Sequence, residues 1–175
     1  IEEDLPADRS SMLLAVLPEH PVAAASLGQV YRVGLPAEEG GTPKDIAIKI
    51  LRPSAPDTVA CDALIARGIA QWAEGLRLPG AGRLLRPALV AGVDEFFSRL
   101  WEEMDLQHEA ANIERFGVLY GPGGSAARRL RRAGDGGEIV LPRVAREWSG
   151  GRVLGMSWIE GEPLLSRGRA VLREA

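Results

Sequence analysis

The sequence predicts an α+β fold in which an antiparallel β-hairpin is followed by helices and then by a second hairpin. Two patterns carry this prediction. The segment 45–51, "DIAIKIL", places isoleucine at every second position, which is typical of a strand. Residues 57–78 and 87–120 instead carry apolar side chains at helical spacing. Of the 175 residues, 46% are hydrophobic, which is enough apolar material for a core.

The N-terminal part is expected to contain a helix and a hairpin. Residues 1–20 hold an apolar run that a proline ends, which predicts a short helix. Residues 29–33 are predicted to form a strand that pairs with 45–51 across a polar turn. The isoleucines of the second strand share one face, so Ala47 and Lys49 lie on the other.

The rest of the chain is expected to be helical and then extended. Two helical regions, 57–78 and 87–120, precede the Gly- and Arg-rich segment 121–137, which we expect to be a flexible loop. Strands at 138–144 and 152–159 are predicted around a glycine turn. The apolar residues that define the two helical regions are Val59, Leu64, Ile65, Ile69 and Trp72 in the first, and Val93, Phe96, Phe97, Leu100 and Met104 in the second.

Composition excludes several classes of function. A net charge of −3 gives no general attraction to nucleic acid, so no nucleic-acid partner is expected. One cysteine and two histidines leave no disulfide framework and no metal site of the Cys/His type, and no metal ligands are expected in the chain. No apolar run reaches the roughly 18 residues that a membrane-spanning helix needs. The chain does not begin with Met, and we expect it to be part of a longer protein.

Lys49 lies opposite the isoleucine face and admits two interpretations. One is an edge-strand lysine that blocks aggregation. The other is a phosphate contact, which the preceding sequence favours. The segment 23–30, "AAASLGQV", has the spacing of the Gly-x-Gly-x-x-Gly-x-Val loop that covers the phosphates in protein kinases, with alanine in the first two glycine places. "AIK" at 47–49 matches the kinase motif Val-Ala-Ile-Lys in the same order along the chain.

A lysine in that role needs a glutamate from a helix, and the segment 101–116, "WEEMDLQHEAANIERF", is the expected donor. The alternative is a solvated acidic face, although the apolar stripe of the same segment indicates that it packs on the core. If this helix is continuous, Asp105 and Glu109 are four residues apart and share a face. Their carboxylates then repel each other unless a cation lies between them.

These residues together resemble the UbiB family of atypical protein-kinase-like proteins, also called the aarF-domain family. The resemblance covers nearly the whole chain and rests on "PVAAASLGQVYR", "IAIKILRP", "VDEFFSRLWEEMDLQHEAANIERF" and "VLGMSWIEGEPL". It implies a protein-kinase-like N-lobe, with an antiparallel sheet, a C-type helix and an inserted helical region between Lys49 and Glu109.

The resemblance implies two catalytic residues, Lys49 on the nucleotide phosphates and Glu109 paired with it. Two acids, Glu103 and Asp105, would line the pocket. The other expected nucleotide-binding residues form the phosphate loop, the base-binding surface and the hinge, in that order: Ala23, Ala24, Ala25 and Ser26; Val30, Ala47 and Met156; Ser157, Trp158 and Ile159.

The implied organisation is a partial kinase domain whose C-lobe, with the catalytic loop and the Asp-Phe-Gly motif, is expected outside this chain. Its predicted segments are the N-terminal helical segment 1–20, the alanine-rich loop and lysine strand 21–53, the inserted helices 54–100, the glutamate helix 101–120, the loop 121–137 and the strands with the hinge 138–165.

The function that the resemblance implies is binding of ATP or ADP with magnesium, as part of a kinase or ATPase in isoprenoid-quinone or prenyl-lipid metabolism. The magnesium ligands are expected in the C-lobe. The alternatives are a pseudokinase scaffold or interaction module without catalysis, and a purely structural α+β domain. A chloroplast location is expected, with the mitochondrion as the alternative. Contact of the full-length protein with lipid or a membrane surface is left open.

Overall fold

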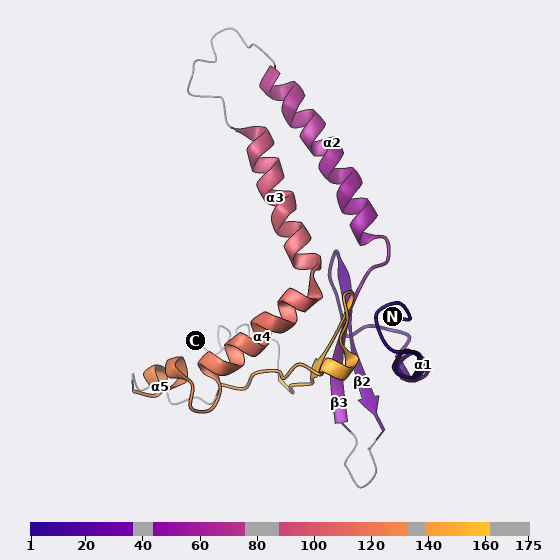
Figure 1. Cartoon of the computed structure of the whole chain (residues 1–175), viewed down its shortest axis with the longest axis vertical. Coiled ribbons are helices and arrows are strands. Elements are labelled where there is room, and N and C mark those ends of the chain that lie inside the picture. Colours follow the sequence, from indigo (N-terminus) through magenta and orange to yellow (C-terminus); the bar gives the residue numbers. More distant parts are fainter. Residues whose placement is uncertain (37–43, 76–87, 133–138, 162–175) are drawn as a thin grey trace, which may run out of the picture.

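The centre of the molecule is a four-stranded antiparallel sheet with the order β1-β2-β3-β4 (Figure 1). The computed structural model describes residues 1–36, 44–75, 88–132 and 139–161. Its strands are Ala23–Ala24 (β1), Gly28–Leu35 (β2), Lys44–Leu51 (β3) and Val153–Ser157 (β4). The predicted α+β fold and the first hairpin are confirmed.

The register of the sheet decides which side chains share a face. Val30 of β2 lies opposite Lys49 of β3, and Lys49 in turn lies opposite Leu154 of β4. Directly paired residues of an antiparallel sheet point to the same side. Ala47 and Met156, paired two positions further along, therefore lie on the same face as Lys49.

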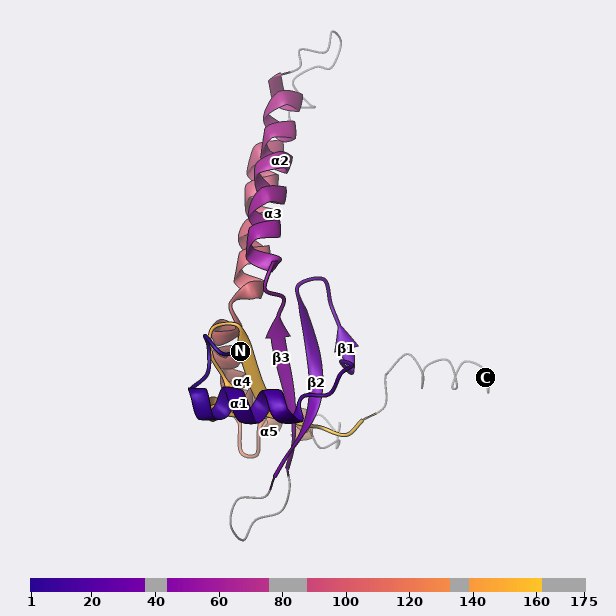
Figure 2. The same cartoon turned by 90° about the vertical axis from the view of Figure 1, so that its right-hand side faces the viewer.

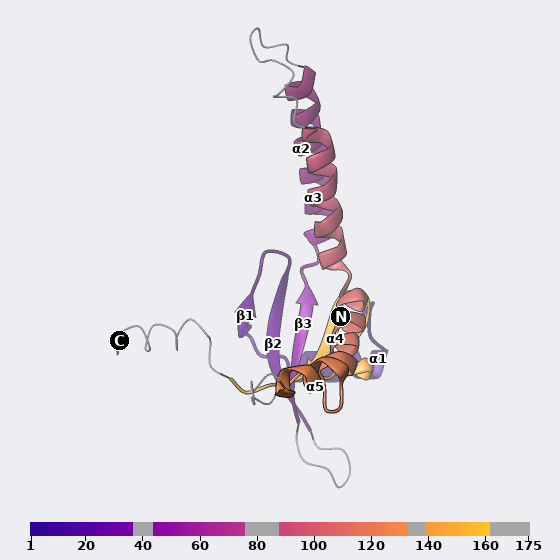
Figure 3. The ribbon, with the colours of Figure 1, turned by 90° about the vertical axis from the view of Figure 1, so that its left-hand side faces the viewer.

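The two faces of the sheet pack against different helices. Helix α1 (Ala7–Val16) and the 3₁₀ turn Arg146–Trp148 cover the face with the isoleucines, and helix α4 (Leu106–Tyr120) covers the face with Lys49 (Figures 2 and 3). The first core contains Leu5, Leu13, Tyr31, Val33, Ile46, Ile48, Trp148 and Val153. The second core contains Leu51, Ala55, Val59, Met104, Leu106, Ala110 and Leu154.

Helices α2 (Ala55–Gly75) and α3 (Leu89–Met104) form an antiparallel pair that extends away from the sheet (Figure 1). Most of the apolar residues that predicted α2 do not face α3. Leu64, Ile65, Ile69 and Trp72 are 60–73% exposed. A row of more buried positions recurs along α2 at intervals of three or four residues: Ala55, Val59, Ala63, Ala66, Ala70 and Ala73. Small side chains thus form the seam, because they let the two helices approach closely.

Three predictions about local structure are corrected. The predicted helix 87–120 is not continuous, because α3 ends at Met104 and α4 begins at Leu106. The predicted loop 121–137 contains helix α5 (Ser125–Arg132), and residues 133–137 lie outside the described part. The predicted strand 138–144 is absent from the described residues 139–144, which form a single bridge through Val144 to Met156.

Candidate functional site

An ion pair between Lys49 and Glu109 forms the centre of the candidate site. The Lys49 ammonium donates to Oε2 of Glu109 over 2.5 Å. Lys49 lies in β3, and Glu109 lies in the first turn of α4, 60 residues later in the sequence. Both side chains are partly buried, so the pair is shielded from solvent more than a surface pair. This is the pairing that the sequence predicted.

Asp105 determines where the helix that carries Glu109 begins. Its carboxylate accepts hydrogen bonds from the backbone N–H groups of Gln107 and His108, at 3.0 and 3.2 Å. These are two of the donors that the first turn of a helix leaves without a partner. The chain changes direction at this cap, where α3 stops and α4 begins. Glu109 therefore lies in the first turn of α4, at the positive end of the helix dipole. Asp105 and Glu109 therefore do not face each other on one helix.

The alanine-rich segment forms a narrow loop over the edge of the sheet. Ala23 and Ala24 pair with Val30 and Gln29, and the amide of Ala25 donates to the carbonyl of Gly28 over 2.8 Å. Among the described residues, no residue other than glycine has a positive φ. The alanines thus fit this loop without strain, and they hold it in conformations that glycine would not enforce.

A cleft of about 540 Å³ lies between this loop and the junction of α3 with α4. Lys49 and Glu109 lie in its wall, as do Ala25 and Ser26 of the loop and Glu103 of α3. Asp105 is not among the lining residues, because its carboxylate caps α4. The cleft therefore brings together two of the four predicted phosphate-loop residues, the lysine, the glutamate and one of the two predicted acids, whereas Ala23 and Ala24 pair in the sheet and do not line it.

The predicted base-binding residues lie on the same sheet face, next to this cleft. Ala47 is buried, whereas Val30 and Met156 are partly buried. At the predicted hinge, the amide of Ser157 donates to Arg143 O over 2.8 Å and that of Trp158 donates to Asp45 O over 3.2 Å. These two backbone amides are therefore already engaged within the protein.

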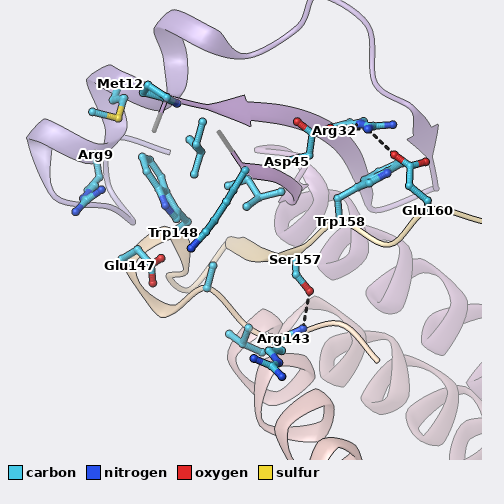
Figure 4. Close-up of a pocket in the computed structure, with 16 residues that line it drawn as sticks. Arg9, Met12, Arg32, Asp45, Arg143, Glu147, Trp148, Ser157, Trp158 and Glu160 are labelled. Carbon is cyan, nitrogen blue, oxygen red and sulfur yellow. Dashed lines mark hydrogen bonds and ion pairs between the residues drawn. The ribbon is translucent and has the colours of Figure 1, made fainter. Parts of the chain in front are cut away.

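A second, larger cavity of about 920 Å³ lies where β4 leaves the sheet (Figure 4). Arg9 and Met12 of α1 and Trp148 line one side, and Arg32 and Trp158 line the other. It does not contain the Lys49–Glu109 pair. We therefore assign the functional site to the smaller cleft.

Ion pairs occupy the charged side of the larger cavity. Arg32 donates to Asp45 over 2.7 Å, pairs with Glu160 over 2.5 Å and lies 4.7 Å above the ring of Trp158. The hydrogen bond to Asp45 raises the pKa of Arg32, so its charge is held by these partners. The close-up shows Arg32, Glu160 and Trp158 gathered at one end of the cavity.

Several contributors to the site were missed in the sequence. His108 and Asn112 line the cleft with Glu109. Asn112 could have been identified by its position three residues after Glu109 on the same helix face, whereas His108 is adjacent to Glu109 in sequence and carries no such signal. Arg146 binds Glu114 of α4 through two hydrogen bonds, at 2.8 and 2.6 Å. Glu114 and Arg146 are 32 positions apart in the sequence, so no local pattern signals this contact.

Within the described ranges, no group of three or more His, Cys, Asp and Glu side chains is arranged to hold a metal ion. In the same ranges, no helix is both long and apolar enough to cross a membrane.

Comparison with known proteins decides the family. Residues 1–170 match the model of the ABC1 atypical kinase-like domain. The chain belongs to the ABC1 atypical kinase-like family. An uncharacterized protein of Synechocystis sp. is 37% identical over 92% of the chain, and an uncharacterized chloroplastic aarF domain-containing protein kinase of Arabidopsis thaliana is 37% identical over 94%. Chloroplastic ACTIVITY OF BC1 COMPLEX KINASE 1 of Arabidopsis thaliana is 35% identical over 92%.

The ABC1 chain spans about a fifth of the length of these curated relatives, since it covers 20% of each. Among solved structures, the complex of Rv3197 with erythromycin from Mycobacterium tuberculosis superposes with a TM-score of 0.60 at 24% identity. That alignment covers 95% of this chain and 39% of the other. It supports the fold of the ABC1 chain and nothing more specific.

Proposed function

We propose that this chain is the nucleotide-binding lobe of an ABC1 atypical kinase or ATPase. The observation that carries the proposal is the 2.5 Å contact between Lys49 and Glu109, in a cleft bordered by the alanine-rich loop. In kinase-like sites a lysine on the third strand contacts the nucleotide phosphates and a helix glutamate keeps that lysine in place. The same two residue types meet here from a strand and a helix that are 60 residues apart.

In this proposal each part of the cleft has a separate task. Lys49 places its positive charge beside the phosphates of ATP or ADP, and Glu109 fixes its position. The amides of the alanine-rich loop lie above the phosphates, and the alanines limit the backbone angles with which the loop can close on them. Glu103 adds a negative charge to the lining of the cleft.

The donor groups of the cleft fit nucleotide phosphates better than they fit a metal ion. Lys49 supplies a cation, and the described residues contain no cluster of carboxylates for magnesium. Magnesium, when bound with the nucleotide, neutralises charge that develops on the phosphates. We propose that its ligands come from the C-lobe of the full-length protein, together with the residue that positions the nucleophile.

We further propose that the full-length protein supports isoprenoid-quinone or prenyl-lipid metabolism in the chloroplast. Support for the location comes from the chloroplastic Arabidopsis relatives. Import of the labelled full-length protein into isolated chloroplasts, with mitochondria as the comparison, tests the location.

Nucleotide binding is tested by substituting Lys49 in the full-length protein. We expect Lys49→Ala to weaken binding of ATP and ADP at least tenfold, because the phosphates lose their cation, with little change in the unfolding temperature. Lys44→Ala is the control, since Lys44 lies on the same strand but is exposed and points to the opposite face. Equal nucleotide affinities for wild type and Lys49→Ala, by calorimetry, would favour a scaffold function instead.

A further inference from the structure

The contact between α4 and the sheet has an apolar part that cannot by itself orient Glu109. Leu106 and Ala110 are 1% exposed and Ile113 packs beside them, against a surface that includes Leu154 and Met156. Apolar contact is not directional. It brings the helix onto the sheet, whereas directional contacts select the rotation of the helix about its own axis.

Two ion pairs lie on opposite sides of this apolar seam. At about 100° per residue, Glu109 lies about 100° before Ala110 around the helix and Glu114 about 40° after it. Leu106 and Ile113 fall about 40° and 60° before Ala110, so the centre of the seam lies midway between the two carboxylates. Glu109 binds Lys49 of β3 on one side, and Glu114 binds Arg146 on the other.

Glu114 and Arg146 form a bidentate ion pair. Arg146 Nε donates to one carboxylate oxygen over 2.8 Å and Nη2 donates to the other over 2.6 Å. A two-point contact of this kind fixes direction as well as distance. The hydrogen bond from Arg146 lowers the pKa of Glu114 and raises that of Arg146, so both groups keep their charges at neutral pH. Arg146 itself lies in the 3₁₀ turn that packs on β4 through Trp148.

A small roll of α4 is enough to break the functional pair. A roll of about 20° moves a group on the surface of a helix of this diameter by about 2 Å. When that displacement is directed away from Lys49, it takes the 2.5 Å contact beyond hydrogen-bond distance. Among the described residues, Glu109 and Glu114 are the α4 side chains with ion pairs to other elements.

We propose that Glu114 and Arg146 are a positioning pair that fixes the roll of α4 and thereby holds Glu109 against Lys49. The inference rests on the proposed nucleotide site. Neither residue touches the nucleotide in this scheme, and both act through Glu109.

The experiment measures nucleotide affinity and turnover in the full-length protein, and the rate at which an amine-reactive ester labels Lys49. We expect Glu114→Ala and Arg146→Ala each to weaken nucleotide binding or turnover about fivefold or more, and to speed labelling of Lys49 because Glu109 no longer covers it. The exchanged pair, Glu114→Arg with Arg146→Glu, is expected to restore most of both. Asp94→Ala is the control, since it breaks the similarly exposed pair between Arg67 and Asp94 away from the cleft.

Combination with Glu109→Gln separates positioning from general stability. In that background Arg146→Ala is expected to cause no further loss, because the residue that it positions has lost its charge. A further loss of the same size, or unchanged affinity and labelling in Glu114→Ala while Lys49→Ala fails to bind nucleotide, would overturn the positioning role alone. Unchanged binding in Lys49→Ala as well would overturn the proposed site and this inference with it.

Discussion

Replacement of Asp105 tests whether this residue acts through the backbone or through its charge. The structure gives its carboxylate two backbone donors, at 3.0 and 3.2 Å, in the first turn of α4. Loss of such a cap costs about 1 kcal/mol, within a range of roughly 0.5–2. For a chain of this size that corresponds to a fall of about 2–4 °C in the unfolding temperature. Asp105→Ala is therefore expected to lower it by about that amount.

Asp105→Asn is the matched variant, because asparagine caps a helix about as well as aspartate but carries no charge. We expect it to lose less than half of what Asp105→Ala loses when thermal unfolding is followed by circular dichroism. Equal losses in the two variants would refute the cap as the contribution of this residue. If Asp105→Asn unfolds like wild type but binds nucleotide as poorly as Asp105→Ala, then its charge acts in the pocket, as the family resemblance implied.

Three further outcomes are expected. Ala25→Gly should change the ratio of ATP to ADP affinities, because glycine frees the backbone of the phosphate loop; an unchanged ratio, by calorimetry, would mean that alanine serves packing alone. Gly155→Ala should lower the free energy of unfolding, measured in urea, by about 1–3 kcal/mol. The reason is that the new methyl carbon would lie 2.6 Å from Cβ of Trp148 and 2.9 Å from the carbonyl oxygen of Trp148. A variant as stable as the wild type would show that the turn carrying Trp148 can shift. The pKa of Glu114 is lowered from 4.5, so its stabilising contact should persist above that pH and be lost as the pH falls below it. The unfolding temperature of Glu114→Gln should accordingly fall less between pH 6 and pH 4 than that of the wild type.

The sequence predicted the parts of the site that depend on strong local patterns. Alternation in 45–51 predicted the strand, and it placed Lys49 on the face that meets α4. The family motif then supplied Glu109, which the structure brings to within 2.5 Å of Lys49. Neither the distance nor the cleft follows from periodicity, because both depend on how α4 packs 60 residues later.

The misplaced elements have identifiable physical causes. The apolar stripe that ends at Met104 resumes at Leu106, two residues later instead of three or four, and this shift of phase is the sequence signal of the break that the continuous-helix prediction overlooked. The apolar run 139–141 has strand propensity, but Pro142 has no N–H for a ladder, and pairing is limited to the bridge at Val144. The segment 121–137 was predicted to be a loop because of its glycines. The alanines and arginines of α5 are good helix formers, and they form a helix between those glycines.

The α2–α3 pair also affects how readily the chain can fold. Lys49 and Glu109 are the ends of a 60-residue segment, and closing a flexible loop of that length is entropically costly. The two helices contact each other and can form from contacts within the segment. Among the described residues, the short connections that then join the pair to the lysine strand and to the glutamate helix are Leu51–Ala55 and Met104–Leu106. Shortening the effective loop about eightfold removes three doublings, or about 2 kcal/mol. The helical pair therefore brings Lys49 and Glu109, the two ends of the segment, within reach of each other.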